Sequence, residues 1–146
     1  MAILSKDRIS LQANATDKAD AIRKAGELLV NSGCVLPEYI DGMFAREQSM
    51  STSLGNGVAI PHGIYENREH ILQTGISVLQ LTDGVEWEEG EKVFLVIGIA
   101  ASSDEHVGVL SNLAEVVDDE ESLAELLKTD DPEVVLKYLG EKEESS

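Results

Sequence analysis

The run "VFLVIGIA", residues 93–100, constrains the fold of this chain more than any other stretch. All of its residues are apolar or glycine, which is typical of a central β-strand that is covered on both faces. No apolar run in the sequence approaches the ~18 residues that a membrane-spanning helix needs, so we expect no direct membrane insertion. We therefore predict a strand here, in the middle of a sheet with helices on both sides.

Strand and helix patterns alternate along the rest of the chain. We predict further strands at 7–12, 58–60 and 75–81, and helices at 16–33, 36–48, 102–117, 119–128 and 131–140. This alternation favours an α/β domain with three layers, in which helices cover both faces of one sheet. The 146 residues fit a single domain. We expect this domain to span residues 1–140, followed by a disordered acidic tail over 141–146.

Two of the predicted helices carry clear signals at their ends. The helix at 16–33 has Thr16 or Asp17 as its N-cap and Gly33 as its stop. The last helix has Asp131 as its cap and Pro132 at its first position, where the missing N–H of proline costs nothing.

The formal net charge of −17 excludes some classes of function. The 11 lysines and arginines are too few for a nucleic-acid surface, which needs cations to meet phosphates. Most of the acidic side chains are expected to form a solvated surface, which could also attract a basic partner. A single cysteine, Cys34, and the absence of a signal-peptide pattern favour the cytoplasm.

The stretch "GNGVAIPHG", residues 55–63, contains the first candidate for chemistry, His62. Glycines in such a loop allow a bound group to approach the backbone closely, and leave N–H groups for an anion. Pro61 restricts the backbone before the histidine and so helps to aim its ring. The residues alone leave His62 open as a nucleophile, a general base, a metal ligand or a structural residue of the turn.

Two further side chains could act with His62. His106 falls in the first turn of the helix predicted directly after the strand at 93–100, and helix N-termini favour oxyanions. Arg46 lies one turn after Met43, at the border of the buried side predicted for the helix at 36–48, which also includes Glu47. A guanidinium offers paired donors to phosphate oxygens. A surface salt bridge would explain Arg46 equally simply, and a capping role at the helix start would explain His106. Together the three residues would suit transfer of a phosphoryl group through an imidazole, with no metal or cofactor.

Other arrangements of these residues are weaker. His62, His106 and Cys34 could supply three zinc ligands, but no short-spaced ligand pair is present. Cys34 has no neighbouring motif that would activate it, so a semi-buried thiol is expected, and His70 is expected at the surface. The remaining arginines are weaker phosphate ligands than Arg46; they are Arg8, Arg23 and Arg68.

At this point the chain resembles a known family. "LGNGVAIPHG" and "LVIGIAASSDEHVGVLSNLAEVV" are similar to the EIIA domains of the bacterial phosphoenolpyruvate-dependent sugar phosphotransferase system, in their fructose–mannitol superfamily. The segment "AIRKAGELLVNSGCVLPEYIDGMFARE" is similar to the helix pair of the mannitol-specific type. The resemblance covers roughly residues 5 to 140 and implies a single mixed β-sheet flanked by helices.

The resemblance also implies an activity. EIIA domains take a phosphoryl group from the phosphohistidine of HPr and pass it to a cysteine of EIIB, which phosphorylates the sugar that enters through the membrane protein EIIC. The phosphorylated histidine of the family corresponds to His62, with Nε2 as the accepting nitrogen (tele-phosphohistidine). The second active-site histidine corresponds to His106, and the active-site arginine to Arg46.

Some features leave alternatives open. Ile64 follows the "PHG" motif where mannitol-type members often have threonine, and the glycine loop also occurs in fructose and nitrogen-regulatory types. The chain could therefore be a regulatory binding module controlled by phosphorylation, or an interaction domain in which His62 is inert. Since the sequence stops soon after the last helix, we expect EIIB and EIIC to be separate polypeptides.

Overall fold

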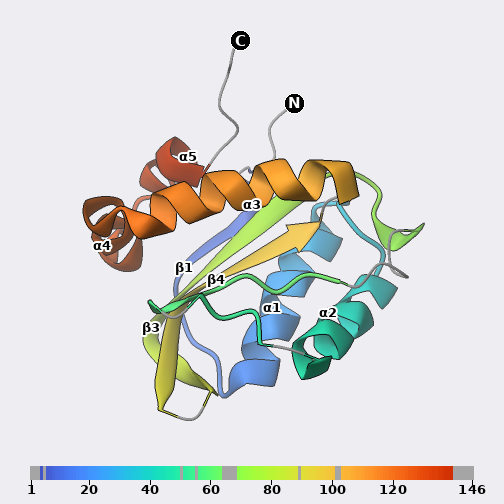
Figure 1. The fold of residues 1–146 in the computed structure, drawn as a ribbon, viewed down its shortest axis with the longest axis horizontal. Helices are drawn as coiled ribbons and strands as arrows, with labels where there is room; N and C mark the ends of the chain where they lie inside the picture. The colour runs from blue at the N-terminus through green and yellow to red at the C-terminus, as the bar shows by residue number, and fades with distance from the viewer. Residues whose placement is uncertain are drawn as a thin grey trace.

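The structure is a computed structural model that describes residue 4 and residues 6–49, 51–54, 56–63, 69–88, 90–100 and 103–139; for residues 88 and 103–110 the description covers the backbone alone. Within these ranges a four-stranded sheet forms the centre, and helices pack on both of its faces (Figure 1). The predicted three-layer α/β architecture is confirmed. No helix in the described ranges is long and apolar enough to cross a membrane.

The sheet is mixed, as the family resemblance implies. Its order is β1-β3-β4-β2, with β1 at Ile9–Ala13, β2 at Val58–Ala59, β3 at Gly75–Glu88 and β4 at Glu91–Ala100. β1 runs parallel to β3 and β2 runs parallel to β4, whereas β3 and β4 are antiparallel. The apolar run at 93–100 therefore makes up most of an inner strand, as predicted.

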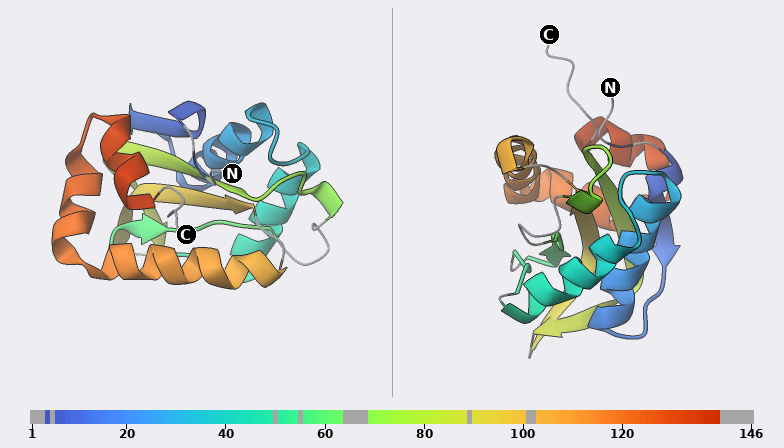
Figure 2. Two further views of the ribbon diagram at one scale, coloured as in Figure 1. Left: turned by 90° about the horizontal axis from the view of Figure 1, so that it is seen from above. Right: turned by 90° about the vertical axis from the view of Figure 1, so that its right-hand side faces the viewer.

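The helices cover the sheet in two groups. One face carries α1 (Lys18–Asn31) and α2 (Glu38–Ser49), and the other carries α3 (Ser103–Asp118), α4 (Glu120–Lys128) and α5 (Pro132–Leu139) (Figure 2). A short 3-10 helix, η1 (Lys6–Arg8), precedes β1. Successive side chains of a strand point to opposite faces, so the apolar inner strands can supply both layers of helices with a buried surface.

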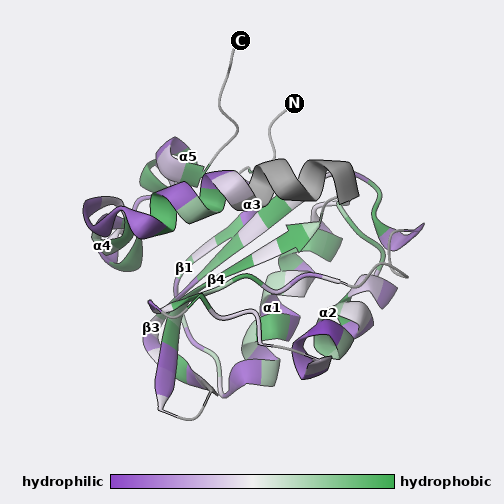
Figure 3. Cartoon of the chain, in the orientation of Figure 1, coloured by the Kyte–Doolittle hydropathy of each residue, from purple (hydrophilic) through white to green (hydrophobic). Residues whose placement is uncertain are grey.

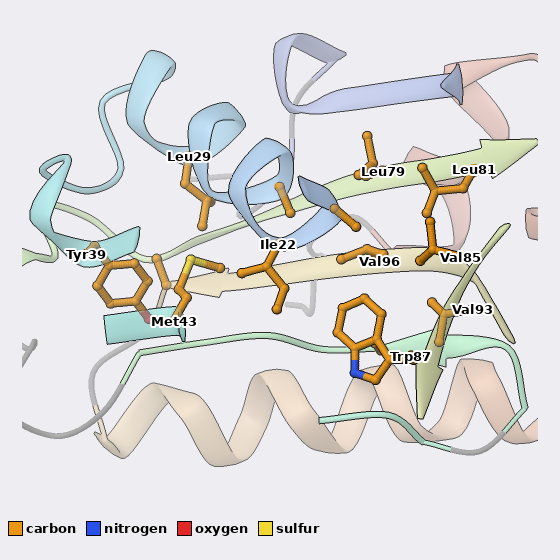
Figure 4. Close-up of a cluster of buried hydrophobic side chains, with 14 of the residues drawn as sticks. Ile22, Leu29, Tyr39, Met43, Leu79, Leu81, Val85, Trp87, Val93 and Val96 are labelled. Atoms are coloured by element: carbon orange, nitrogen blue, oxygen red, sulfur yellow. The ribbon is translucent and has the colours of Figure 1, made fainter. Parts of the chain in front are cut away.

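Each face of the sheet has its own apolar core. On the side of α1 and α2, Leu79 and Val96 of the sheet pack with Ile22, Leu29 and Met43 of the helices (Figure 4). The other core joins alternate residues of the same strands to α3, α4 and α5; it includes Val78, Leu95, Ile97, Leu113, Leu126 and Val135. In Figure 3 hydrophobic and hydrophilic positions alternate along the helices, as is typical of helices with one buried side.

The ends of α1 and α5 confirm the signals in the sequence. Asp17 is the N-cap of α1, and its carboxylate accepts a hydrogen bond from the N–H of Asp20 over 2.8 Å. Gly33 has a φ of +84°, a left-handed conformation in which a side chain would be strained. Asp131 accepts from the N–H of Glu133 over 3.0 Å, and α5 begins at Pro132.

The strand predicted at 75–81 is longer than expected. β3 continues through the turn-like residues at 82–84 as far as Glu88, with an irregular register against β4 between Gln80 and Val85. Gly84 has a φ of +72°, and a Cβ there would lie 2.8 Å from the ring of Phe94. A glycine at this position therefore lets β3 bend past Phe94 and continue, where the sequence pattern predicted that the strand would stop.

Several predictions fall on residues outside the described ranges. These are the tail at 141–146, the weaker candidate Arg68 and the unusual residue Ile64. The domain boundary at residue 140 stays a prediction.

Candidate active site

His62 lies just after β2, at the edge of the sheet where β2 and β4 both end. The two strands run parallel, and an isolated parallel bridge between His62 and Ile99 continues their pairing. The N–H of Ile99 donates to the carbonyl of Pro61 over 3.0 Å, and His62 itself is half-buried. His62 therefore sits at the carboxyl ends of two neighbouring strands, the edge at which open α/β sheets bind ligands.

The orientation of the His62 ring distinguishes its two nitrogens. Nδ1 lies 3.0 Å from the carbonyl oxygen of Gly63. Because a carbonyl oxygen can only accept a hydrogen bond, the neutral ring carries its proton on Nδ1 and donates it to Gly63. Nε2 then has the in-plane lone pair, which is the electron pair that a nucleophile needs. The geometry supports Nε2 as the reacting atom.

Tyr39, which the sequence reasoning missed, anchors the segment that carries His62. Its hydroxyl accepts the N–H of Gly63 over 2.9 Å and donates to the carbonyl of Ile99 over 2.7 Å. Burial raises the pKa of Tyr39, and the hydrogen bond from Gly63 opposes this only in part, so the phenol stays protonated. The signal was present in the sequence: Tyr39 stands one turn before Met43 on the buried side of α2, and a buried tyrosine hydroxyl needs a partner.

Arg46 lies in the last turn of α2 and is half-buried, which confirms its predicted place at the border of the buried side. It follows Tyr39 by seven positions, so it lies two turns, or about 10 Å, further along the same side of the helix. Side chains of a helix lean toward its N-terminus. The guanidinium of Arg46 is therefore expected to reach back toward the turn that carries Tyr39, on the side that faces the His62 segment.

Glu47, next to Arg46, is a buried carboxylate with many partners. It accepts hydrogen bonds from the hydroxyl of Thr52 over 2.6 Å, from the N–H of Thr52 over 3.1 Å and from the Trp87 indole over 2.8 Å. Lys18 forms an ion pair with it over 3.2 Å. Burial alone would raise the pKa of Glu47, but these interactions outweigh it and hold the pKa below its ordinary value. Glu47 therefore stays ionised and ties the end of α2 to three other segments.

His106 belongs to the first turn of α3, as predicted, although its side chain lies outside the described part of the structure. β4 ends at Ala100 and α3 begins at Ser103, so only two residues separate the strand from the helix. Ile99, which pairs with His62, is the next-to-last residue of β4. The structure therefore places the His62 segment beside the strand that leads directly into the helix of His106.

The other candidates occupy structural positions. Cys34 is fully buried, and its sulfur contacts Ser32 and Gln73. His70 is half-buried rather than exposed, and its carbonyl accepts from the N–H of Leu36. Among the side chains that the structure describes, no group of three or more histidines, cysteines and carboxylates could hold a metal ion.

The two described arginines other than Arg46 have partners away from this site. Arg8 is buried, and its Nε donates to the carbonyl of Ile76 over 3.1 Å. Arg23 is exposed and pairs with Asp20 and Glu27 on its own helix. Of the three described arginines, Arg46 alone lies on the helix that also contacts the His62 segment.

Known proteins resemble this chain over nearly its whole length. The family model described as "Phosphoenolpyruvate-dependent sugar phosphotransferase system, EIIA 2" matches residues 2–142. The chain belongs to this family. A mannitol-specific phosphotransferase enzyme IIA component of Halalkalibacterium halodurans is 45% identical over 142 residues, which cover 97% of each chain. The family resemblance that the motifs indicated is confirmed.

Solved structures of EIIA proteins have the same fold. A chain from the complex of enzyme IIAMTL and phosphorylated enzyme IIBMTL of Escherichia coli matches with a TM-score of 0.87 and 40% identity, over 93% of this chain and 96% of that one. The nitrogen regulatory protein IIA-Ntr of Neisseria meningitidis matches with a TM-score of 0.80 and 29% identity, over 94% and 96%. This EIIA chain spans 17–38% of the length of related multiphosphoryl transfer proteins and of a mannitol-specific EIICBA component.

Proposed function

We propose that this EIIA chain is a phosphocarrier. It accepts a phosphoryl group from the phosphohistidine of HPr on Nε2 of His62, and passes the group to a cysteine of a mannitol EIIB that works with a membrane EIIC. The observation that carries this proposal is the hydrogen bond of Nδ1 to the Gly63 carbonyl, which keeps the lone pair on Nε2.

The transfer consists of two displacements at phosphorus. In the first, the Nε2 lone pair forms an N–P bond while the N–P bond of phospho-HPr breaks, and the HPr ring leaves with that electron pair. In the second, the thiolate of EIIB forms an S–P bond while the N–P bond at His62 breaks. The proton on Nδ1 remains in place throughout, so His62 leaves as a neutral imidazole and returns to its starting state.

Arg46 and His106 would stabilise the phosphoryl oxygens during both steps. Such transfers depend mainly on position and on donors around the equatorial oxygens, and need no cofactor. Arg46 follows Tyr39, which contacts the residue after His62, by two turns of α2, and His106 would act from the N-terminal turn of α3, where the helix dipole also favours negative charge.

The mannitol EIIB is the acceptor that the comparisons favour. The relative from Halalkalibacterium halodurans is named mannitol-specific and is 45% identical, whereas the nitrogen regulatory protein is 29% identical. The second candidate, a phosphorylation-controlled regulatory module of the nitrogen or fructose type, rests on the TM-score of 0.80 to that protein. Either function belongs in the cytoplasm, where HPr and the phosphoenolpyruvate-dependent enzyme I would supply the phosphoryl group.

The experiment is a reconstituted relay. The chain is incubated with phosphoenolpyruvate, enzyme I and HPr, and the product is tested for an acid-labile, base-stable phosphate on His62. Purified EIIB proteins that are specific for mannitol, for fructose and for other sugars are then added one at a time. We expect the mannitol EIIB to remove the phosphate at least about tenfold faster than the others.

Variants of His62 and His70, the two histidines whose side chains the structure describes, provide the matched comparison. His62→Ala should abolish labelling, while His70→Ala should be labelled like the unaltered chain. Undiminished labelling of His62→Ala would show that His62 is inert. A labelled chain that no EIIB discharges would favour the regulatory module.

A further inference from the structure

The Tyr39 hydroxyl joins two stretches of main chain that flank the site. It accepts the N–H of Gly63, which follows His62, and donates to the carbonyl of Ile99, near the end of β4. We propose that Tyr39 is a positioning residue that keeps the His62 ring in its Nδ1–H tautomer. This inference rests on the proposed function, because the tautomer matters only if Nε2 reacts.

Gly63 is the link through which Tyr39 acts on His62. Its N–H binds the Tyr39 hydroxyl, and its carbonyl accepts the Nδ1–H of His62. Glycine has wide backbone freedom, so nothing in Gly63 itself keeps that carbonyl turned toward the ring. The peptide group between His62 and Gly63 is planar, so binding its N–H fixes the orientation of the backbone that enters Gly63. Only the φ and ψ of Gly63 then separate this fixed plane from the carbonyl that accepts the Nδ1–H.

Burial makes the Tyr39 hydroxyl hard to replace. Tyr39 is only 3% exposed and Ile99 is fully buried, so water has little access to the hydroxyl and to the Ile99 carbonyl, whereas Gly63 is half-buried. A hydroxyl has one hydrogen and two lone pairs: the hydrogen goes to Ile99, and a lone pair accepts from Gly63. Removing the oxygen leaves the half-buried N–H of Gly63 and the buried carbonyl of Ile99 without this partner, which favours local rearrangement of the chain.

Rearrangement at Gly63 changes the chemistry of His62. Without an acceptor at Nδ1, the neutral ring exchanges between its two tautomers. The Nε2–H form has no lone pair at Nε2 and cannot attack phosphorus until its proton moves. Loss of the Tyr39 hydroxyl therefore lowers the fraction of reactive molecules and leaves the docking of HPr unchanged.

The test compares two tyrosine variants that each lose one oxygen. Tyr39→Phe removes the proposed anchor, whereas Tyr138→Phe removes a hydroxyl of α5 that donates to Glu125. The ring nitrogens of His62 are observed by ¹⁵N NMR in the unphosphorylated chain, and transfer from phospho-HPr is followed by rapid quench. In Tyr39→Phe we expect the tautomer ratio to shift about tenfold toward Nε2–H, with kcat down by about two- to tenfold and KM unchanged. In Tyr138→Phe both readouts should match the unaltered chain.

The NMR measurement separates this inference from the proposed function. The measurement uses neither HPr nor EIIB. If the chain is never phosphorylated on His62, the proposed function is wrong, and the tautomer ratio still shows whether Tyr39 holds the ring in its Nδ1–H form. A folded Tyr39→Phe chain that keeps the Nδ1–H form and its kcat would overturn the inference. If that variant does not fold, the same NMR measurement on the unaltered chain tests the inference. Mixed tautomers at His62 would overturn it, and a single Nδ1–H form together with a Gly63 amide that is protected from exchange would support it.

Discussion

The indole Nε1–H of Trp87 donates a hydrogen bond of 2.8 Å to the carboxylate of Glu47. Trp87 lies near the end of β3, and Glu47 lies in the last turn of α2, next to Arg46. The same carboxylate binds Thr52, which precedes the glycine loop of the site, and Lys18 at the start of α1. One buried charge therefore joins four segments of the chain, and we expect it to hold the turn that carries Arg46.

Replacing Glu47 should destabilise the fold strongly. Glu47→Gln keeps the shape of the side chain but removes the charge that Lys18 and the Thr52 and Trp87 donors surround. We expect the free energy of unfolding to fall by about 2–4 kcal/mol, measured by urea denaturation. The control is Glu27→Gln, since Glu27 pairs with Arg23 on an exposed surface of α1. A loss no larger than that of the control would contradict a structural role for the Glu47 charge.

The unaltered chain and Glu47→Gln should also differ in how their stability responds to acid. The pKa of Glu47 is lowered in the folded chain, so its stabilising contribution is fully present above the unfolded pKa of about 4.3. The contribution is then lost as the pH falls through the lower pKa of the folded state. We expect the difference in unfolding free energy between the unaltered chain and Glu47→Gln to be constant above about pH 5.5 and to shrink below about pH 4.3. A difference that stays constant down to pH 3 would show that Glu47 does not titrate in this way.

Arg46 should matter for rate more than for stability. Arg46→Gln removes the guanidinium that we assign to the phosphoryl oxygens, so transfer from phospho-HPr should slow by about 10²–10³-fold. Arg46→Lys should recover only part of this loss, because an ammonium offers no planar pair of donors. Arg23→Gln, which breaks the surface pairs with Asp20 and Glu27, is the matched control and should transfer at the normal rate. Equal rates for the Arg46 and Arg23 variants would exclude Arg46 from the site.

His106 should assist transfer without being the acceptor. His106→Gln should still be phosphorylated on His62, but we expect rapid-quench rates about 10–100-fold lower, because one donor to the phosphoryl group is missing. The control is His70→Gln, whose side chain lies in the segment before β3. If His106→Gln abolished labelling altogether while remaining folded, the assignment of His62 as the sole acceptor would have to be revised.

The acidic surface should make the encounter with HPr sensitive to salt. With a formal charge of −17, the chain should attract a basic face on its partner at long range. We expect the second-order rate of transfer to fall about three- to tenfold between about 0.05 M and 0.5 M ionic strength, as screening shortens the Debye length. Hydrolysis of the phosphorylated chain alone involves no encounter and serves as the control. A second-order rate constant that does not change with ionic strength would show that electrostatic steering does not contribute to the encounter.

Local patterns were sufficient for most of the elements. The apolar run at 93–100 predicted the inner strand, and Asp17 and Pro132 predicted where two helices begin, because each signal depends on residues only a few positions apart. The same reasoning failed at β3, where the turn-like residues at 82–84 bend the strand without ending it. The reason is a long-range one, since the space beside Gly84 is filled by Phe94 of the neighbouring strand.

The amino-acid sequence by itself determined the layered fold, the family and the short motif that contains His62. Only the tertiary structure decided how that histidine is held. Tyr39 binds main-chain groups 24 and 60 positions away, and Trp87 reaches Glu47 across 40 positions. Such contacts leave no periodic trace in a sequence, because they arise when packing the helices on the sheet brings distant polar groups together in a place that excludes water.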